Sequence, residues 1–442
     1  MLRFSTNTRT DLAIKNIGLS FLIKGGSIII SFILVPLTLG YLNSYEYGVW
    51  LTLNSILSWV YVFDIGLGNG LRNKLTEALA REDYELCRTY ISTAFFILAI
   101  LGLGLFGLFS IVQPFLDWYS ILNVKKESIN GLSTIIYIVF AFIILNFIFK
   151  NIGIIFISKQ YPAINDLLIL IGSLFSLIII YILTLVTTGS LAWVAYTFSG
   201  IPVIIYIISY PITFKRYPNL KPSLKYIDKR YWRSLMELGL KFFLIQISVV
   251  IVYTTSNIII SQLFGPEEVT PYNIGFKLFS SVTIVFNLLL IPFWSAITDA
   301  ISKNDIIWIN KVMKKLFKLW GLAVIGTGIL VFLSPMIFKI WIGNEVQIPF
   351  IFSVLFGIYV CISIGTGIFS TYVNGIGKLR VQLIATLLQA IIFIPFAVWA
   401  GKAWGVKGII ISLIFTSGIN LVWGPIQCYK LLNGKAYGIW NK

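Results

Sequence analysis

The chain of 442 residues is 58% hydrophobic and only 12% charged, with a mean hydropathy of +0.90. Soluble domains carry roughly 25% charged residues, so this composition excludes a soluble globular protein. Lys and Arg outnumber Asp and Glu by 34 to 17, and the sequence contains no histidine, which removes a common zinc ligand and the usual base of acid–base catalysis.

Apolar segments of about 20 residues recur along the whole chain, and each is long enough to cross the roughly 30 Å hydrocarbon core of a bilayer. This pattern predicts an all-α polytopic membrane protein, because the strands of an outer-membrane barrel would alternate over about ten residues. The first segment is too long for a signal-peptide core and is interpreted as an uncleaved span. The twelve predicted spans cover residues 17–42, 47–71, 90–114, 132–154, 164–187, 190–211, 236–263, 271–297, 319–342, 349–374, 380–401 and 406–429.

The basic residues indicate which ends of these spans face the cytoplasm. Most of them lie in the N-terminal tail, in the even-numbered connections and their margins, such as Lys150 near the end of the fourth span and Lys159 after it, and in the C-terminal tail. The positive-inside rule therefore predicts cytoplasmic N- and C-termini, which agrees with an even number of spans. The net charge of +17 thus reflects membrane topology rather than nucleic-acid binding.

Two pairs of segments indicate an internal repeat. Phe21-Leu-Ile-Lys24 aligns with Phe243-Leu-Ile-Gln246, and residues 75–83 align with residues 297–305 at the same offset. Each half then has six spans and starts in the cytoplasm, which is typical of a parallel repeat with its site between the halves. The predicted organisation is a six-helix lobe at 1–211, a basic cytoplasmic linker at 212–235 and a second six-helix lobe at 236–442.

Charged residues inside the spans are the main candidates for a binding site. Lys24 and Asp64 are expected roughly 12–14 Å from the cytoplasmic side, Lys241 at a similar depth, and Lys277 nearer the outer side. A charge at mid-span costs about 2.5–3.5 kcal/mol, so these side chains should face water or a partner. Three cations cannot all be paired with one acid, which favours a cationic cavity that attracts an anionic substrate. The alternative is a structural ion pair of Lys24 with Asp64, with the other lysines extending toward water.

The stretch Phe63-Asp-Ile-Gly-Leu-Gly-Asn-Gly-Leu-Arg-Asn-Lys74 is glycine-rich but lies in a predicted span with no preceding strand, which argues against a nucleotide-binding loop. Asp64, Gly68 and Arg72 are spaced by four and are expected on one helix face. A Gly-x-x-x-Gly step favours close helix packing, and a flexible polar entrance for a head group is the alternative. The glycines assigned to helix flexibility or packing are Gly25, Gly26, Gly66, Gly68 and Gly70.

Cysteines give no sign of a cofactor. Cys87, Cys361 and Cys428 form no Cys-x-x-Cys pair, so no metal, haem or disulfide is expected.

The opening of the chain resembles a known family. Pro36-Leu-Thr-Leu-Gly-Tyr-Leu42, Tyr47-Gly-Val-Trp50 and residues 63–73 are similar to the bacterial polysaccharide transporters, the O-antigen-type flippases of the multidrug/oligosaccharidyl-lipid/polysaccharide exporter superfamily. The resemblance implies a MATE-like fold of two six-helix lobes around a central cavity, in the bacterial inner membrane. It implies a substrate of oligosaccharide on undecaprenyl pyrophosphate, moved from the inner to the outer leaflet by alternating access coupled to H⁺ or Na⁺.

In that family's terms, the pyrophosphate or acidic sugars would contact Lys24, Arg72, Lys241 and Lys277, and Asp64 is the candidate for ion coupling. Other partners would be membrane lipids and the polysaccharide polymerase machinery. The alternatives are a cation or drug exporter of the same superfamily and a polytopic glycosyltransferase or polymerase. An enzyme is disfavoured because the longest outer connection, about residues 113–131, offers few catalytic groups.

Overall fold

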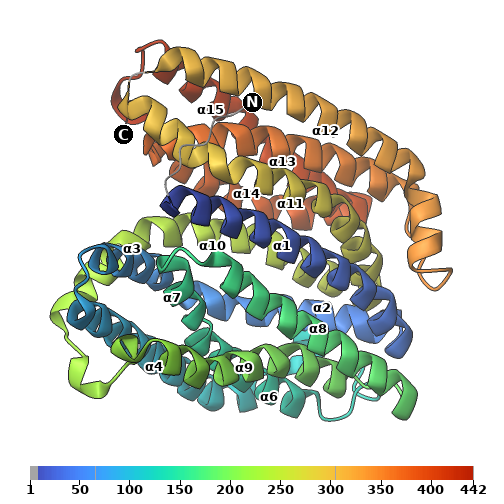
Figure 1. Ribbon diagram of the computed structural model, residues 1–442. Helices are drawn as coiled ribbons and strands as arrows, with labels where there is room; N and C mark the ends of the chain where they lie inside the picture. The colour runs from blue at the N-terminus through green and yellow to red at the C-terminus, as the bar shows by residue number, and fades with distance from the viewer. Residues whose placement is uncertain (1–7, 65, 304, 442) are drawn as a thin grey trace. The chain divides into compact units, whose positions relative to one another are not determined.

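The computed structural model describes residues 8–64, 66–303 and 305–441, and all regular structure within these ranges is helical (Figure 1). Ten of the described helices are long and apolar enough to cross a membrane. This confirms the prediction of an all-α polytopic membrane protein. The chain divides into two compact units, Met1–Phe243 and Leu244–Lys442.

The first unit contains nine α-helices, four short 3₁₀ segments and the start of a tenth α-helix. Their bounds are α1 Thr8–Tyr41, α2 Ser44–Ser58, η1 Trp59–Asp64, α3 Leu67–Ala80, α4 Tyr84–Val112, η2 Gln113–Phe115, α5 Trp118–Leu122, α6 Leu132–Phe149, α7 Ile152–Ser158, α8 Pro162–Val186, α9 Leu191–Arg216, η3 Pro218–Leu220, η4 Leu224–Tyr226 and α10 Arg230–Phe264. Within this unit α1 packs along α8, α6 packs against α9, and α3 packs against both α4 and α7.

The second unit is built from the rest of α10 and five long helices. Their bounds are α11 Pro266–Ser302, α12 Ile306–Trp341, α13 Phe350–Ile376, α14 Arg380–Trp404 and α15 Val406–Leu432, followed by the 3₁₀ turn η5 Gly438–Asn441. Helix α13 is central to this unit because it packs against α11, α12 and α15, and α14 pairs with α15.

The segment predicted as the second span is not one continuous helix. The α-helical course ends at Ser58, continues as the 3₁₀ segment η1 to Asp64, and restarts as α3 at Leu67. Gly66 precedes α3 with φ 71° and ψ 12°, the left-handed conformation that glycine adopts without strain. The prediction that Asp64 and Arg72 share one helix face is therefore wrong, because the break at Gly66 interrupts the helical periodicity between them.

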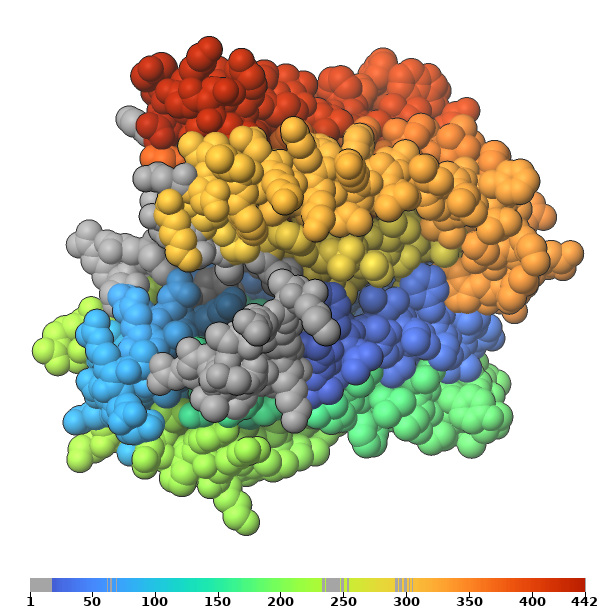
Figure 2. All heavy atoms as spheres, turned by 45° about the horizontal axis from the view of Figure 1, so that its top comes forward, coloured from blue at the N-terminus to red at the C-terminus, as the bar shows by residue number. Residues whose placement is uncertain are grey.

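Helix α12 forms an outer surface of the second unit, in yellow to orange in Figure 2. Its first turns expose Lys311, Lys314, Lys315 and Lys318, whereas its second half exposes Ile325, Phe332 and Ile340 among other apolar side chains. The exposed surface thus changes from ammonium groups to hydrocarbon near residue 319, where the sequence predicts that the span begins. This change along one helix is typical of a helix that leaves the bilayer.

The basic segment after α9 is docked on the first turns of α4. The N–H of Ser223 donates to the hydroxyl of Ser92 at 3.0 Å, and the N–H of Asp228 donates to the hydroxyl of Thr93 at 3.1 Å. The Arg88 guanidinium donates to the carbonyl of Lys221 at 2.8 Å. These contacts tie the linker to the first unit rather than leaving it as a free tether.

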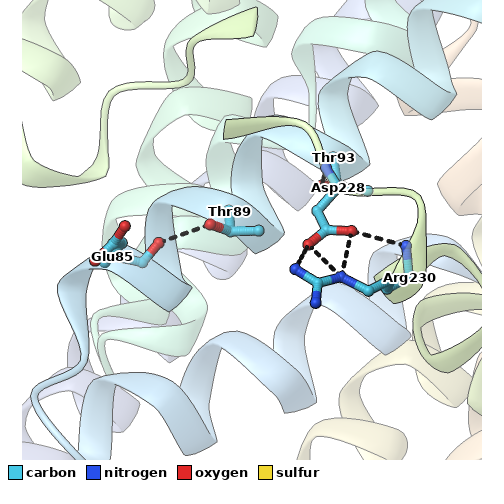
Figure 3. A network of polar contacts seen from close by, with 5 residues as sticks. All are labelled: Glu85, Thr89, Thr93, Asp228 and Arg230. Atoms are coloured by element: carbon cyan, nitrogen blue, oxygen red, sulfur yellow. Dashed lines mark hydrogen bonds and ion pairs between the residues drawn. The ribbon is translucent and has the colours of Figure 1, made fainter. Parts of the chain in front are cut away.

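Asp228 and Arg230 form an ion pair at the C-terminal end of this linker (Figure 3). The guanidinium donates to both carboxylate oxygens, the shortest contact being 2.6 Å, and the Arg230 N–H donates at 2.9 Å. These hydrogen bonds hold the pKa of Asp228 below its ordinary value. The carboxylate is thus ionised at neutral pH, and its contribution to stability is lost only as the pH falls through this lowered pKa.

Candidate functional site

The charged pair inside the first unit joins α1 to α8. The ammonium of Lys24 lies 3.7 Å from Oδ2 of Asp166, with 40% of the Lys24 side chain and 11% of the Asp166 side chain exposed. The two helices pack along each other, so each side chain projects from a candidate span toward its neighbour. A distance of 3.7 Å is too long for a hydrogen bond, and Oδ2 of Asp166 has no hydrogen-bond partner among the described residues.

This pair changes the charge balance that the sequence predicts. Asp166 is a second acid inside a span, so the prediction of one intramembrane acid is wrong, and Lys24 is not an isolated cation. The signal was present in the sequence, since Asn165-Asp166 stands at the start of a long apolar run. The side chain of Asp64, the acid that pairs with Lys24 in the alternative to a cationic cavity, lies outside the described residues.

The other predicted cations lie on three different helices. Arg72 is exposed on α3, and its carbonyl accepts hydrogen bonds from Thr76 at 2.7 Å and Ser158 at 3.3 Å. Lys277 is half-buried on α11 in the second unit. Lys241 belongs to α10, and its side chain lies outside the described residues.

The predicted packing glycines differ in what surrounds them. A Cβ on Gly70 would collide with the backbone carbonyl of Leu235, so the absence of a side chain allows α3 and α10 to approach. A Cβ on Gly26 would make an ordinary contact of 3.5 Å with Leu170 of α8, and one on Gly25 would meet nothing within 4 Å. Gly68 lies in the first turn of α3 and is buried. Close packing is therefore the role of Gly70, while Gly66 provides the turn described above.

A cavity of about 450 Å³ lies inside the first unit, between α1, η1, α6, α8 and α9. Most of its wall is apolar, but Tyr61, Asn146 and Lys150 meet on one side of it. The amide of Asn146 donates to the Tyr61 hydroxyl at 2.8 Å, and the Lys150 ammonium lies 4.7 Å from the centre of the Tyr61 ring. The buried Oδ1 of Asn146 has no partner in the described part of the chain. Lys150, which the sequence assigns only to a connection, thus also contributes to an interior surface.

No group of three Cys, Asp or Glu side chains among the described residues is placed to hold a metal ion. The partly exposed ammonium of Lys24, which lies beside Asp166, is instead suited to bind an anion in place of that carboxylate.

Solved structures of MATE transporters have the same fold. An inward-facing multidrug resistance MATE transporter of the MOP superfamily superposes with a TM-score of 0.75 at 15% sequence identity, covering 96% of this chain and 100% of that one. An outward-facing MATE transporter of the same superfamily gives a TM-score of 0.64 at 15% identity, with 98% and 99% covered. The fold is therefore that of a MATE-type membrane transporter.

The sequence comparisons give the family. Residues 13–297 match the family described as polysaccharide biosynthesis protein. A putative O-antigen export protein of Yersinia pseudotuberculosis is 25% identical over 410 residues, which is 90% of this chain and 91% of that protein. A putative O-antigen transporter of Salmonella typhimurium is 25% identical over 409 residues, with 89% and 91% covered. The chain belongs to the polysaccharide biosynthesis protein family.

These relatives confirm the resemblance that the motifs between Pro36 and Asn73 indicated. With ten candidate spans and relatives that are named as transporters, the chain is a multi-pass transporter of the bacterial inner membrane and not an enzyme.

Proposed function

We propose that the protein is a flippase that moves an undecaprenyl-pyrophosphate-linked oligosaccharide, an O-antigen or capsule repeat unit, from the inner to the outer leaflet. The observation that carries this proposal is that relatives named for O-antigen export match about nine-tenths of the chain. The MATE-type fold supports it, because solved transporters with this fold are described in both an inward-facing and an outward-facing conformation.

The pair of Lys24 and Asp166 supports a specific role for α1. The two charges attract each other at 3.7 Å without a hydrogen bond, and the lysine is partly exposed. A pyrophosphate can compete for this ammonium because charge-assisted hydrogen bonds to phosphate oxygens are among the strongest in proteins. Lys24 thus exchanges a carboxylate for the substrate head group, and Arg72, Lys241 and Lys277 provide further positive charge along the path.

We further propose that transport is coupled to H⁺ or Na⁺ through a carboxylate of the first lobe. Asp166 joins Asp64 as a candidate, because its Oδ2 is buried and lacks a hydrogen bond among the described residues. Protonation or sodium binding there would weaken its attraction for Lys24 and leave the ammonium free for the substrate. The 450 Å³ cavity begins two residues further along α8, at Leu168, and offers a polar surface near this acid.

The test is translocation of labelled undecaprenyl-pyrophosphate-linked oligosaccharide in proteoliposomes. Lys24→Gln should lower the rate about tenfold, the effect of losing one contact worth about 1.4 kcal/mol. Lys339→Gln, which removes an exposed charge from the last turn of α12, is the matched control and should transport normally.

The coupling ion is tested by imposing a pH gradient or a sodium gradient across the same vesicles. Wild-type transport should respond to one of them, and Asp166→Asn or Asp64→Asn should abolish that response. Absence of any translocation by the wild type would refute the flippase, whereas gradient-independent transport would refute only the coupling.

A further inference from the structure

A second cavity, separate from the charged pair on α1, lies at the predicted cytoplasmic end of the first unit. It measures about 420 Å³ and is formed by the ends of α3, α4, α7, α8 and α9. Its lining includes Lys159, with Tyr84, Tyr161 and Tyr217 around it. Neither the predicted transport path nor the linker contacts account for this group of side chains.

Two cations meet at one aromatic ring of this cavity. The Lys159 ammonium lies 4.4 Å from the centre of the Tyr217 ring, and the Arg216 guanidinium lies 5.7 Å from it. In the part of the chain that the structure describes, neither cation has a carboxylate within ion-pair distance. Lys159 lines the cavity, and its positive charge, with no described acid within ion-pair distance, produces a local potential that attracts an anion.

Hydrogen-bond donors are also available at the cavity. The hydroxyls of Tyr84, Tyr161 and Tyr217 make no hydrogen bond to any described residue. The smaller hydroxyls of Thr76 and Ser158 are already used, because both donate to the carbonyl of Arg72. A phosphate group, which accepts several hydrogen bonds and carries negative charge, matches three phenol donors beside an ammonium.

Two of the neighbouring acids are held by other partners. Asp83 precedes α4, and its carboxylate accepts the N–H of Leu86 at 2.9 Å as a helix cap. Glu77 pairs with Lys74 at 3.2 Å. These acids are occupied by their own partners on α3 and α4.

The surroundings indicate where the phosphate comes from. Leu167 of α8 and Ile212 of α9 lie within two turns of Tyr161 and Tyr217, and they are 40% and 63% exposed. A polar cavity at the end of two helices that expose hydrocarbon fits a head group with acyl chains attached. We propose that this cavity binds the phosphate of an anionic glycerophospholipid of the inner leaflet, with Lys159 as its cationic contact.

The experiment measures lipid retention by the full-length protein with native mass spectrometry, from mixed micelles of phosphatidylglycerol and phosphatidylcholine. The wild type should retain phosphatidylglycerol under conditions that remove phosphatidylcholine, and Lys159→Gln should retain about tenfold less. Lys430→Gln is the matched control, because the Lys430 ammonium packs in a similar way, 4.1 Å from the centre of the Trp440 ring. Its retention should equal that of the wild type.

A second arm separates a lipid phosphate from a free one. Inorganic phosphate is added at millimolar concentration to the delipidated protein, and the melting temperature is recorded. We expect no rise that depends on Lys159, and a Lys159-dependent rise without lipid retention would overturn the assignment to lipid.

Tyr217→Phe provides a variant that keeps the aromatic ring and removes only a hydroxyl donor, so it should fold and show reduced retention even if Lys159→Gln does not fold. The proposal is overturned if Lys159→Gln and Tyr217→Phe both retain phosphatidylglycerol like the wild type. It is also overturned if Lys430→Gln loses as much lipid as Lys159→Gln.

Discussion

The ammonium of Lys24 lies beside the carboxylate of Asp166, so its charge inside a predicted span is not left uncompensated. An unpaired lysine on a span would need water or substrate at all times. With Asp166 at 3.7 Å, the charge is compensated in part while 40% of the side chain remains exposed. The residue can therefore be both structural and functional, stabilising α1 against α8 at rest and meeting an anion during transport.

Separating these two roles requires single and double substitutions. Asp166→Asn leaves the ammonium of Lys24 without its acid and should destabilise the protein by about 1–2 kcal/mol, less than the 3–5 kcal/mol typical of a fully buried pair. The double variant Lys24→Gln/Asp166→Asn has no unpaired charge and should recover the lost stability. Melting temperature in detergent and protein level in the membrane are the measurements. Equal losses in the single and double variants would contradict a stabilising contact.

The position of Gly70 has no room for a side chain. A methyl group there would collide with the carbonyl of Leu235, so Gly70→Ala should lower stability by about 1–3 kcal/mol even though alanine favours helix. Gly25→Ala is the matched control, since its Cβ would meet nothing within 4 Å, and it should be neutral or stabilising by up to about 1 kcal/mol. Both are measured by thermal unfolding in detergent, and a Gly70→Ala protein as stable as the wild type would refute the close approach.

Among the helices, two predicted spans are interrupted rather than continuous. The second span is divided by η1 and by the left-handed Gly66, and the fourth is divided between α6 and α7. Such breaks place polar backbone inside the membrane region, which is tolerated only where protein or water surrounds it. The broken segment carrying Asp64 is therefore expected to line an interior surface rather than to face lipid.

The docked linker leads to a prediction about proteolysis. Arg88→Ala removes both the hydrogen bond to the Lys221 carbonyl at 2.8 Å and the stacking of the guanidinium 4.3 Å from the centre of the Tyr226 ring. We expect trypsin to cleave after Lys225 several-fold faster in this variant, because the backbone there is less restrained.

The control for this experiment is Arg81→Ala, which removes an exposed arginine from the turn just before α4 without touching the linker contacts. Cleavage is followed by mass spectrometry of the linker peptides. Equal rates in the wild type and Arg88→Ala would show that the docking does not restrain the linker in solution.

Along the whole chain, the distribution of basic residues predicts which connections and termini lie in the cytoplasm. Reporter fusions test this prediction. Green fluorescent protein should fluoresce when fused to the C-terminus or inserted after Lys225, since both positions are predicted to be cytoplasmic. Alkaline phosphatase should be active only when fused after Lys126, in a predicted outer connection. Active phosphatase at the C-terminus would contradict twelve spans with cytoplasmic termini.

The membrane character, the positions of most helices and the family could be predicted from the sequence alone. The predicted spans 349–374 and 380–401 correspond to α13 at Phe350–Ile376 and α14 at Arg380–Trp404. These predictions succeed because hydropathy and charge act on each segment separately, so a bilayer sorts every span without reference to the others.

The contacts between segments far apart in the sequence could not be predicted and are known only from the fold. Asp166 as the acid beside Lys24, Leu235 against Gly70, and Lys159 beside the Tyr217 ring all depend on which helices become neighbours. Hydropathy carries no information about that choice, because between lipid-covered helices it is packing and polar pairing that select the partners. The sequence determined that the chain crosses the membrane and predicts with which sidedness, whereas the folded structure determined which of its described charged groups lie together.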